Sequence, residues 1–147
     1  MASAAWRLGR SAIGMVIAIG VSGCALHGST THGGPASAPA LRVTERDFRI
    51  SAPTQIRPGD VLLSVRNRGP DNHELLVVRA DGPLPLRKDG RTVDEEAIEP
   101  SLAGVLEPGE PNSVRVLKVH LLPGRYRFIC NMSGHFLGGM DAAFVVK

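Results

Sequence analysis

The sequence predicts an all-β protein, a Greek-key β-sandwich of about seven to eight short strands with one short helix near residues 93–99. Three observations support this fold class. Short apolar runs recur from residue 41 onwards, turn residues such as Pro-Gly and Gly-Pro-Asp separate them at close intervals, and helical periodicity is scarce. At 147 residues the chain has room for one domain of this kind beside a targeting segment.

The first 23 residues have the features of an export signal. Arg7 and Arg10 precede an apolar run that is too short to span a membrane comfortably. The residues from Val21 to Cys24 read VSGC and resemble the bacterial lipobox, where cleavage before the cysteine accompanies its lipidation. We therefore expect a lipoprotein signal peptide over 1–23, a lipidated Cys24, and an exported protein anchored at the extracytoplasmic face of a bacterial membrane. An ordinary signal peptide cut elsewhere, or an uncleaved anchor, would also place the domain outside the cytoplasm.

Residues 24–40 are rich in Gly, Ser, Thr and Pro and show no apolar periodicity, which predicts a flexible tether. A random coil of this length reaches roughly 20–25 Å. His27 and His32 lie in this segment and are interpreted as solvated linker residues. The folded domain is expected over 41–147.

The domain begins with apolar residues between Leu41 and Ile50 and continues with runs at 61–65 and 75–78. The run at 75–78 lacks alternation, which predicts a strand covered on both faces. Residues 81–111 break the rhythm and are interpreted as loop, apart from the short helix.

The helix is expected to begin with a capping box formed by Thr92 and Glu95 and to end at Pro100. Strands are then expected again at 114–121, 125–130 and 141–147.

The residues that carry chemistry lie before the last of these strands. Alternation places Cys130 on the core-facing side of its strand, and His135 and Met140 follow within ten residues. A thiolate, an imidazole and a thioether form a soft ligand set that suits copper rather than calcium or magnesium. A second imidazole is needed for the His₂Cys plane with an axial Met, and His73 is the candidate because it lies at the margin of another strand.

Each of these residues also has an ordinary structural interpretation. Cys130 could be a small buried residue, Met140 a core filler, and the two histidines a loop residue and a strand cap. That interpretation explains neither the spacing nor the unpaired thiol, because a lipidated Cys24 leaves Cys130 without a disulfide partner in an oxidising compartment. His120 is assigned to a polar strand face.

From Leu41 to Lys147 the chain resembles the cupredoxins. The resemblance is carried by Cys130-x₄-His135-x₄-Met140 and by the preceding LPGRYRF sequence, which is like the final hairpin of that family. It implies one type 1 copper ion with His73, Cys130 and His135 as equatorial ligands and Met140 as the axial ligand. Many members have asparagine after the first histidine, whereas this chain has Glu74 there.

The resemblance implies one-electron transfer with an unidentified redox partner protein, and we expect a monomer that is not an enzyme. No His-x-His pair or second domain is present for a multicopper oxidase site. Beyond the signal the chain carries 15 basic and 14 acidic side chains, so nucleic-acid binding is not expected.

Two alternatives remain open at this point: a copper carrier or scavenger that hands copper on, and a binding module that has lost its metal. Met132, Phe136 and Leu137 are open to two interpretations as well, because they could form a docking patch around His135 or seal the end of the core.

Overall fold

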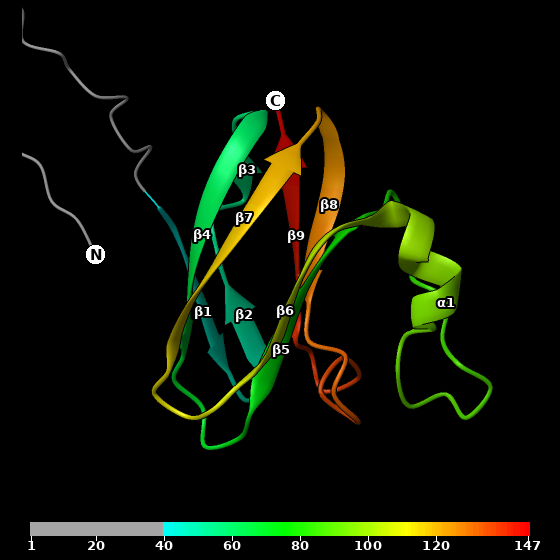
Figure 1. Cartoon of the computed structure of the whole chain (residues 1–147). Coiled ribbons are helices and arrows are strands. Elements are labelled where there is room, and N and C mark those ends of the chain that lie inside the picture. Colours follow the sequence, from blue (N-terminus) through cyan, green and yellow to red (C-terminus); the bar gives the residue numbers. More distant parts are fainter. Residues whose placement is uncertain (1–39) are drawn as a thin grey trace, which may run out of the picture. The chain divides into compact units, whose positions relative to one another are not determined.

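The computed structural model describes residues 40–147 of the chain (Figure 1). The predicted signal peptide, the predicted lipidation site at Cys24 and the predicted tether up to residue 39 lie outside the described residues. Within the described part, no helix has the length and apolar character needed to cross a membrane.

The domain is a sandwich of two β-sheets, so the predicted fold class is confirmed (Figure 1). Sheet A has the strand order β2-β1-β4-β7, and sheet B has the order β3-β9-β8-β5-β6. The strands are β1 (Leu41–Arg46), β2 (Arg49–Ser51), β3 (Gln55–Ile56), β4 (Gly59–Asn67), β5 (His73–Arg79), β6 (Leu102–Gly109), β7 (Val114–Leu121), β8 (Gly124–Ile129) and β9 (Asp141–Val146).

Most neighbouring strands are antiparallel, but β1 pairs with β4 and β3 pairs with β9 in parallel. The chain passes from sheet A to sheet B between β4 and β5, and returns between β6 and β7. Such crossings between two packed sheets are typical of Greek-key sandwiches. They place strands from distant parts of the sequence side by side, so that residues of different strands meet at one end of the domain.

The main core lies between the inner faces of the two sheets. Tyr126, Phe128 and Cys130 point into it, as alternation along β8 predicts. The ring of Phe144 stacks on Tyr126 and on Phe128, with centroids 5.4 and 4.2 Å apart. Cys130 therefore lies at the end of the core, beyond the stacked aromatic rings along the chain.

Strand β5 is buried on both faces, as its continuous apolar run predicts. Leu75 and Val77 belong to the core between the sheets, while Leu76 and Val78 belong to a second apolar cluster outside sheet B. The insertion between β5 and β6 forms the outer side of that cluster, where it contributes Val93. The insertion thus acts as a cover over the outer face of sheet B.

Two details of this insertion differ from the sequence prediction. β6 is a strand where loop was expected. Its residues do not alternate regularly between buried and exposed, so the sequence shows no strand pattern here. The strand forms by pairing with β5 through two register shifts. The short helix is present as α1 (Glu95–Ile98), followed by a 3₁₀ turn (Glu99–Ser101). Its N-cap is Asp94, whose side chain accepts a hydrogen bond from the Ala97 N–H, and not Thr92.

A pair of ionisable side chains lies on the inner face of sheet A. The fully buried Glu45 carboxylate contacts the Arg115 guanidinium at 2.5 Å, while its second oxygen has no hydrogen-bond partner in the described part of the chain. Burial raises the pKa of Glu45 to about 7, although the Arg115 charge and hydrogen bond act in the opposite direction.

This pair predicts that the free energy of unfolding depends on pH. Because the folded-state pKa of Glu45 lies above its ordinary value of 4.5, its contribution to stability is complete below about pH 4.5 and is lost as the pH rises through about 7. The expected loss is on the order of 2–3 kcal/mol. Urea unfolding between pH 4.5 and 8 should show a flatter profile for Glu45→Gln than for the wild type, whereas the exposed Glu110→Gln should keep the wild-type slope. Equal slopes in all three proteins would contradict the prediction.

Candidate metal centre

The candidate ligands come from two neighbouring strands and one loop. His73 is the first residue of β5, and Cys130 directly follows β8. The two strands are antiparallel neighbours with Leu76 opposite Ile129, so the start of β5 and the end of β8 lie at the same end of the sandwich. His135 lies in the loop between β8 and β9, which returns to this end.

Three donor atoms meet at this point. The Nδ1 atoms of His73 and His135 are 3.2 Å apart, and the Cys130 Sγ lies 4.0 Å from the first and 3.5 Å from the second. His73 and Cys130 are 0% exposed, and His135 is 8% exposed. Among the described residues this is a group of side chains that could hold a metal ion.

The triangle has the size that a metal requires. Its circumscribed circle has a radius of about 2.1 Å, and metal–nitrogen and metal–sulfur bonds are about 2.0–2.3 Å long. A single ion in the plane of the three donors would therefore be at bonding distance from all of them. Three-coordinate planar His₂Cys geometry is typical of one class of copper site.

The loop that carries His135 and Met140 is held by its own backbone. The His135 N–H donates to the Met132 carbonyl at 2.9 Å, and the Met140 N–H donates to the His135 carbonyl at 3.0 Å. The Cys130 N–H donates to the Met140 carbonyl at 3.1 Å, which closes the loop. Gly139, at φ 111°, supplies a backbone conformation that other residues rarely adopt.

Met140, the candidate axial ligand, is fully buried and belongs to the same core cluster as Cys130. Its backbone bonds tie it to both Cys130 and His135, so the thioether is carried by the same closed loop as the other two donors.

Burial also sets the protonation of the metal-free site. Burial raises the pKa of the Cys130 thiol to about 11. It also lowers the pKa of His73, although the nearby charge of Asp47 acts to raise that pKa. Cysteine nucleophiles of enzymes have lowered pKa values, whereas the pKa of Cys130 is shifted upward. A buried thiol beside two imidazoles becomes a thiolate when a cation compensates its charge, and this property fits a metal site.

The turn between β1 and β2 covers both histidines. The Asp47 Oδ1 lies 2.6 Å from the His73 Nε2, although the two atoms do not meet the geometry of a hydrogen bond, and neither has a hydrogen-bond partner within residues 40–147. The ring of Phe48 meets the ring of His135 edge-on, with centroids 5.5 Å apart. Gly69 packs against the same contact, because a Cβ atom there would lie 2.6 Å from the His73 Nε2 and 2.7 Å from the Asp47 Oδ1.

A second set of hydrogen bonds ties the ligand strands to the insertion. The Glu74 carboxylate accepts the Asn131 N–H at 3.0 Å, which joins the residue after His73 to the residue after Cys130. The Asn131 side chain accepts the Val93 N–H at 2.6 Å and donates to the Val93 carbonyl at 3.0 Å and to Glu95 at 2.7 Å. Glu74 thus makes a direct link between the two ligand-bearing strands.

Sequence reasoning did not identify Asp47, Phe48 or this role of Glu74. Asp47 and Phe48 lie in a turn with no spacing relation to the ligands, so the sequence carried no signal for them. For Glu74 the signal was its position directly after His73.

The apolar residues near His135 divide between the two interpretations considered above. Phe136 packs into the outer cluster and Met132 packs against the core, so these two seal the end of the sandwich. Leu137 is 54% exposed and Phe48 is 49% exposed, so these two present apolar surface beside the candidate centre.

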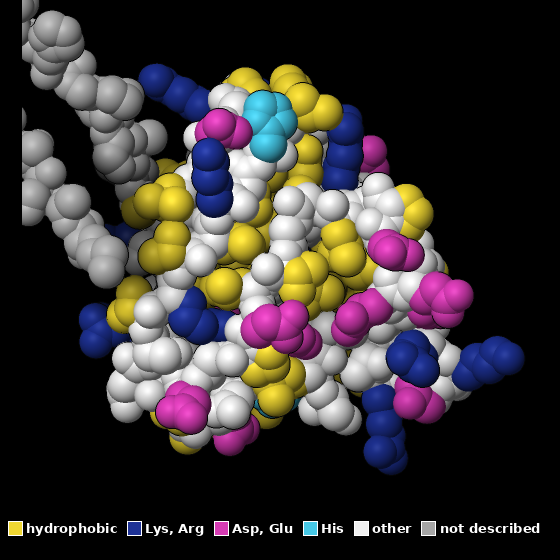
Figure 2. Space-filling model, viewed as in Figure 1, with side chains coloured by type: hydrophobic (Ala, Val, Ile, Leu, Met, Phe, Trp, Pro, Cys, Tyr) yellow, Lys and Arg dark blue, Asp and Glu magenta, His cyan; other side chains and the backbone are white. Residues whose placement is uncertain are grey.

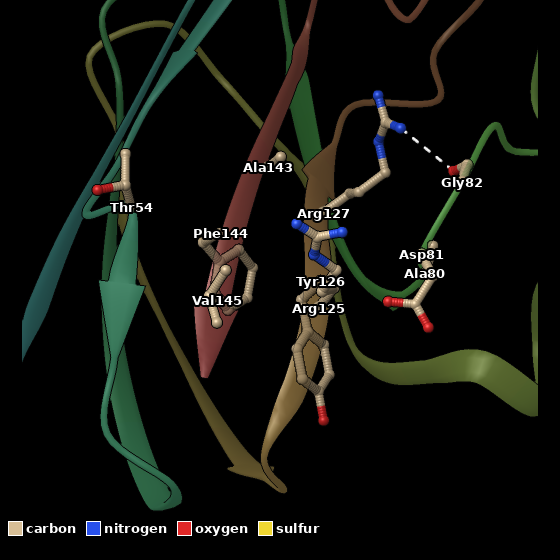
Figure 3. Close-up of a pocket in the computed structure, with 10 residues that line it drawn as sticks. All are labelled: Thr54, Ala80, Asp81, Gly82, Arg125, Tyr126, Arg127, Ala143, Phe144 and Val145. Carbon is tan, nitrogen blue, oxygen red and sulfur yellow. Dashed lines mark hydrogen bonds between the residues drawn. The ribbon is translucent and has the colours of Figure 1, made fainter. Parts of the chain in front are cut away.

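A surface hollow of about 350 Å³ lies elsewhere, beside β8 and β9 (Figure 3). Arg127 crosses it, donating to the Gly82 carbonyl at 3.2 Å and forming an ion pair with Asp141. None of the candidate ligands lines this hollow, so it is separate from the metal centre. His120 is exposed on β7 and pairs with Asp60 at 2.8 Å, as expected for a polar strand face.

No protein-family model matches the sequence, and no curated protein matches it. Solved structures do match the fold. Auracyanin B matches with a TM-score of 0.56 at 17% identity, covering 75% of this chain and 89% of that one. Auracyanin A of Chloroflexus aurantiacus, described as a "blue" copper protein, matches with a TM-score of 0.54 at 15% identity, covering 74% and 98%.

Rusticyanin from Thiobacillus ferrooxidans matches with a TM-score of 0.53 at 16% identity, covering 76% of this chain and 79% of that one. The structural neighbours of this chain are thus cupredoxins, and the domain has a cupredoxin-like fold with a His-Cys-His cluster at one end. At these identities the similarity is one of fold.

The Asn131 network predicts a measurable effect on stability. Asn131→Ala leaves the Val93 N–H and carbonyl without their side-chain partner, and we expect the free energy of unfolding to fall by about 1–3 kcal/mol. The exposed Asn72→Ala is the matched control and should change it by less than about 0.5 kcal/mol. Chemical denaturation measures both, and hydrogen exchange should report faster opening of the insertion in the first variant alone. Equal stability of the two variants would contradict a role for Asn131 as an anchor.

Proposed function

We propose that this chain is a mononuclear type 1 copper protein that transfers single electrons. In this proposal His73, Cys130, His135 and Met140 would hold the copper ion. The observation that carries the proposal is the buried triangle of two imidazole nitrogens and one thiol sulfur with sides of 3.2, 3.5 and 4.0 Å. The cupredoxin-like fold and the mixed nitrogen and sulfur donor set support it.

A bound copper ion would supply a one-electron couple, and the chain would hold its donors in one arrangement. His73 is packed at the start of a strand that is buried on both faces, and His135 lies in a loop closed by backbone hydrogen bonds. Donors that cannot move reduce the rearrangement that accompanies a change of oxidation state. The negative charge of Asp47, 2.6 Å from the His73 Nε2, would favour the ring proton on that nitrogen and leave Nδ1 free to bind the metal.

The burial of the donors bears on the choice between electron transfer and copper delivery. A carrier must release its ion to a partner, whereas here the three donors are almost completely enclosed. A site that keeps its ion through repeated oxidation and reduction suits electron transfer.

The first test is optical. The oxidised, copper-loaded full-length protein is expected to show an intense thiolate-to-copper absorption band in the visible range, and Cys130→Ser should abolish it, since the thiolate is the source of the band. Cys24→Ser is the matched control and should keep the band. Cycles of reduction and reoxidation in the presence of a copper chelator should leave the band unchanged.

Two outcomes would count against the proposal. A protein that takes up no copper, or whose band survives Cys130→Ser, contradicts the ligand set. A protein that binds copper but loses it to the chelator on reduction is a copper carrier and not an electron-transfer protein.

We further propose that the domain works at the outer face of a membrane, held by a lipid on Cys24 after removal of residues 1–23. The support is the order of basic residues, apolar run and VSGC sequence, followed by a segment with tether composition.

Expression in a bacterium with a labelled fatty acid should place the wild-type protein in the membrane fraction with the label attached. Cys24→Ser should lose the label and leave the membrane fraction or remain as an uncleaved precursor, while Cys130→Ser should keep the label. Labelling of Cys24→Ser at the wild-type level would contradict lipidation of this cysteine.

A further inference from the structure

The outward face of sheet A is strongly basic. Alternation along the strands turns apolar residues and Glu45 inward, and leaves the arginines of this sheet on the outer side. Five exposed arginines gather here: Arg42, Arg46, Arg49, Arg66 and Arg68. Among the described residues, none of the five forms an ion pair with a carboxylate. We call these five residues the arginine face.

Three of these arginines form a row across the end of the sheet. Arg46 of β1 is the direct cross-strand partner of Arg49 of β2. Arg68 follows β4, and its N–H donates to the Glu45 carbonyl at 2.8 Å, which places it beside Arg46. Like charges opposite each other destabilise a sheet, so this row imposes an energetic cost that an anionic ligand would relieve.

Beside this row the arginine face is hollowed. Arg42, Arg66 and Arg68 line a depression of about 380 Å³ together with Thr44 and Ser64. Guanidinium groups and hydroxyls bind carboxylates, and arginine does so through two parallel hydrogen bonds.

The row lies next to the metal centre in the chain and in space. Arg46 and Arg49 flank the turn whose two residues cover the histidines, with Asp47 on His73 and Phe48 on His135. Arg68 precedes Gly69, which packs against the same contact. A protein seated on this row would therefore come close to Phe48 and His135.

The charge of the domain is separated between its faces. The outer side of sheet A carries these five arginines and Lys118 against a single acid, Asp60, which lies at the opposite end and pairs with His120. Since the described part has 15 basic and 14 acidic side chains, nine basic and thirteen acidic ones remain elsewhere. Figure 2 shows several of the acidic side chains along β6 and near α1. Such a separation orients a charged partner during approach.

We propose that the arginine face docks an acidic redox partner protein and directs it to the end of the domain that holds Phe48 and His135. This inference rests on the proposed function and names the partner's chemistry. The arginine face contains five arginines and borders the half-exposed ring of Phe48, and protein interfaces are enriched in arginine and aromatic residues. Its position beside the candidate ligands favours a protein that exchanges electrons over an anionic membrane surface.

The test uses one partner with two opposite charges. The copper-loaded full chain is mixed in non-ionic detergent with a small basic cytochrome c, or with the same cytochrome after succinylation of its lysines. One electron passes between the haem iron and the copper, in the direction that the two reduction potentials favour. Stopped-flow absorption gives the second-order rate constant for each cytochrome at low and high ionic strength.

We expect the wild-type rate with the succinylated cytochrome to fall at least tenfold as salt is raised from 10 to 500 mM. The triple variant Arg46→Gln, Arg49→Gln and Arg68→Gln should lower this rate about tenfold or more at low salt and should not lower the rate with the basic cytochrome. The matched control, Arg87→Gln, Arg91→Gln and Arg125→Gln, removes the same charge from other exposed positions and should change the rate with the succinylated cytochrome less than threefold.

The outcomes separate the inference from the function on which it rests. If no copper-dependent band or electron exchange is found, the proposed function fails, and the docking proposal fails with it. If the copper cycles normally but both triple variants react alike with the succinylated cytochrome, the docking proposal alone is overturned. A third outcome would also overturn the docking proposal. The protein would sediment with phosphatidylglycerol vesicles only when Arg46, Arg49 and Arg68 are present, and the triple variant would leave the electron-exchange rate unchanged. This result would assign the arginine face to a membrane.

Discussion

The pairing of β5 with β8 is the constraint on which the candidate centre depends. Because these strands are antiparallel neighbours in a fixed register, the residue that opens one and the residue that follows the other lie at the same end of the sandwich. His73 and Cys130 are 57 positions apart in sequence, yet their donor atoms are 4.0 Å apart. Any shift of this register by one residue would turn one of the two side chains to the opposite face.

Burial gives this end of the domain its chemical character. The thiol of Cys130 has a pKa raised to about 11, and the pKa of His73 is lowered, so the metal-free cluster holds a protonated thiol beside the His73 imidazole, whose affinity for protons is reduced. A thiol whose pKa is raised is a poor nucleophile. The cluster offers two imidazole nitrogens and a sulfur whose negative charge a cation would stabilise, and this combination explains why the geometry supports a metal function.

The parts of the fold outside the ligand strands support the same end of the molecule. The insertion between β5 and β6 covers the outer face of sheet B, and its Val93 is hydrogen-bonded to the side chain of Asn131, the residue that follows Cys130. Glu74 links the two ligand strands directly. On the other sheet, the turn that covers the histidines is flanked by Arg46 and Arg49, so the same short segment shapes the centre and the charge beside it. Structural support and surface recognition are therefore built from neighbouring residues.

The sequence by itself determined the fold class, the inward direction of Cys130 and the local grouping of Cys130, His135 and Met140. These features depend on alternation, turn residues and short spacing, which act over a few residues. Only the tertiary structure decided how close His73 comes to the loop and that residues 102–109 pair as β6. It also decided that Asp47, Phe48 and the row of Arg46, Arg49 and Arg68 lie beside the centre. Contacts between strands far apart in the chain depend on register and crossing connections, and no local pattern encodes them.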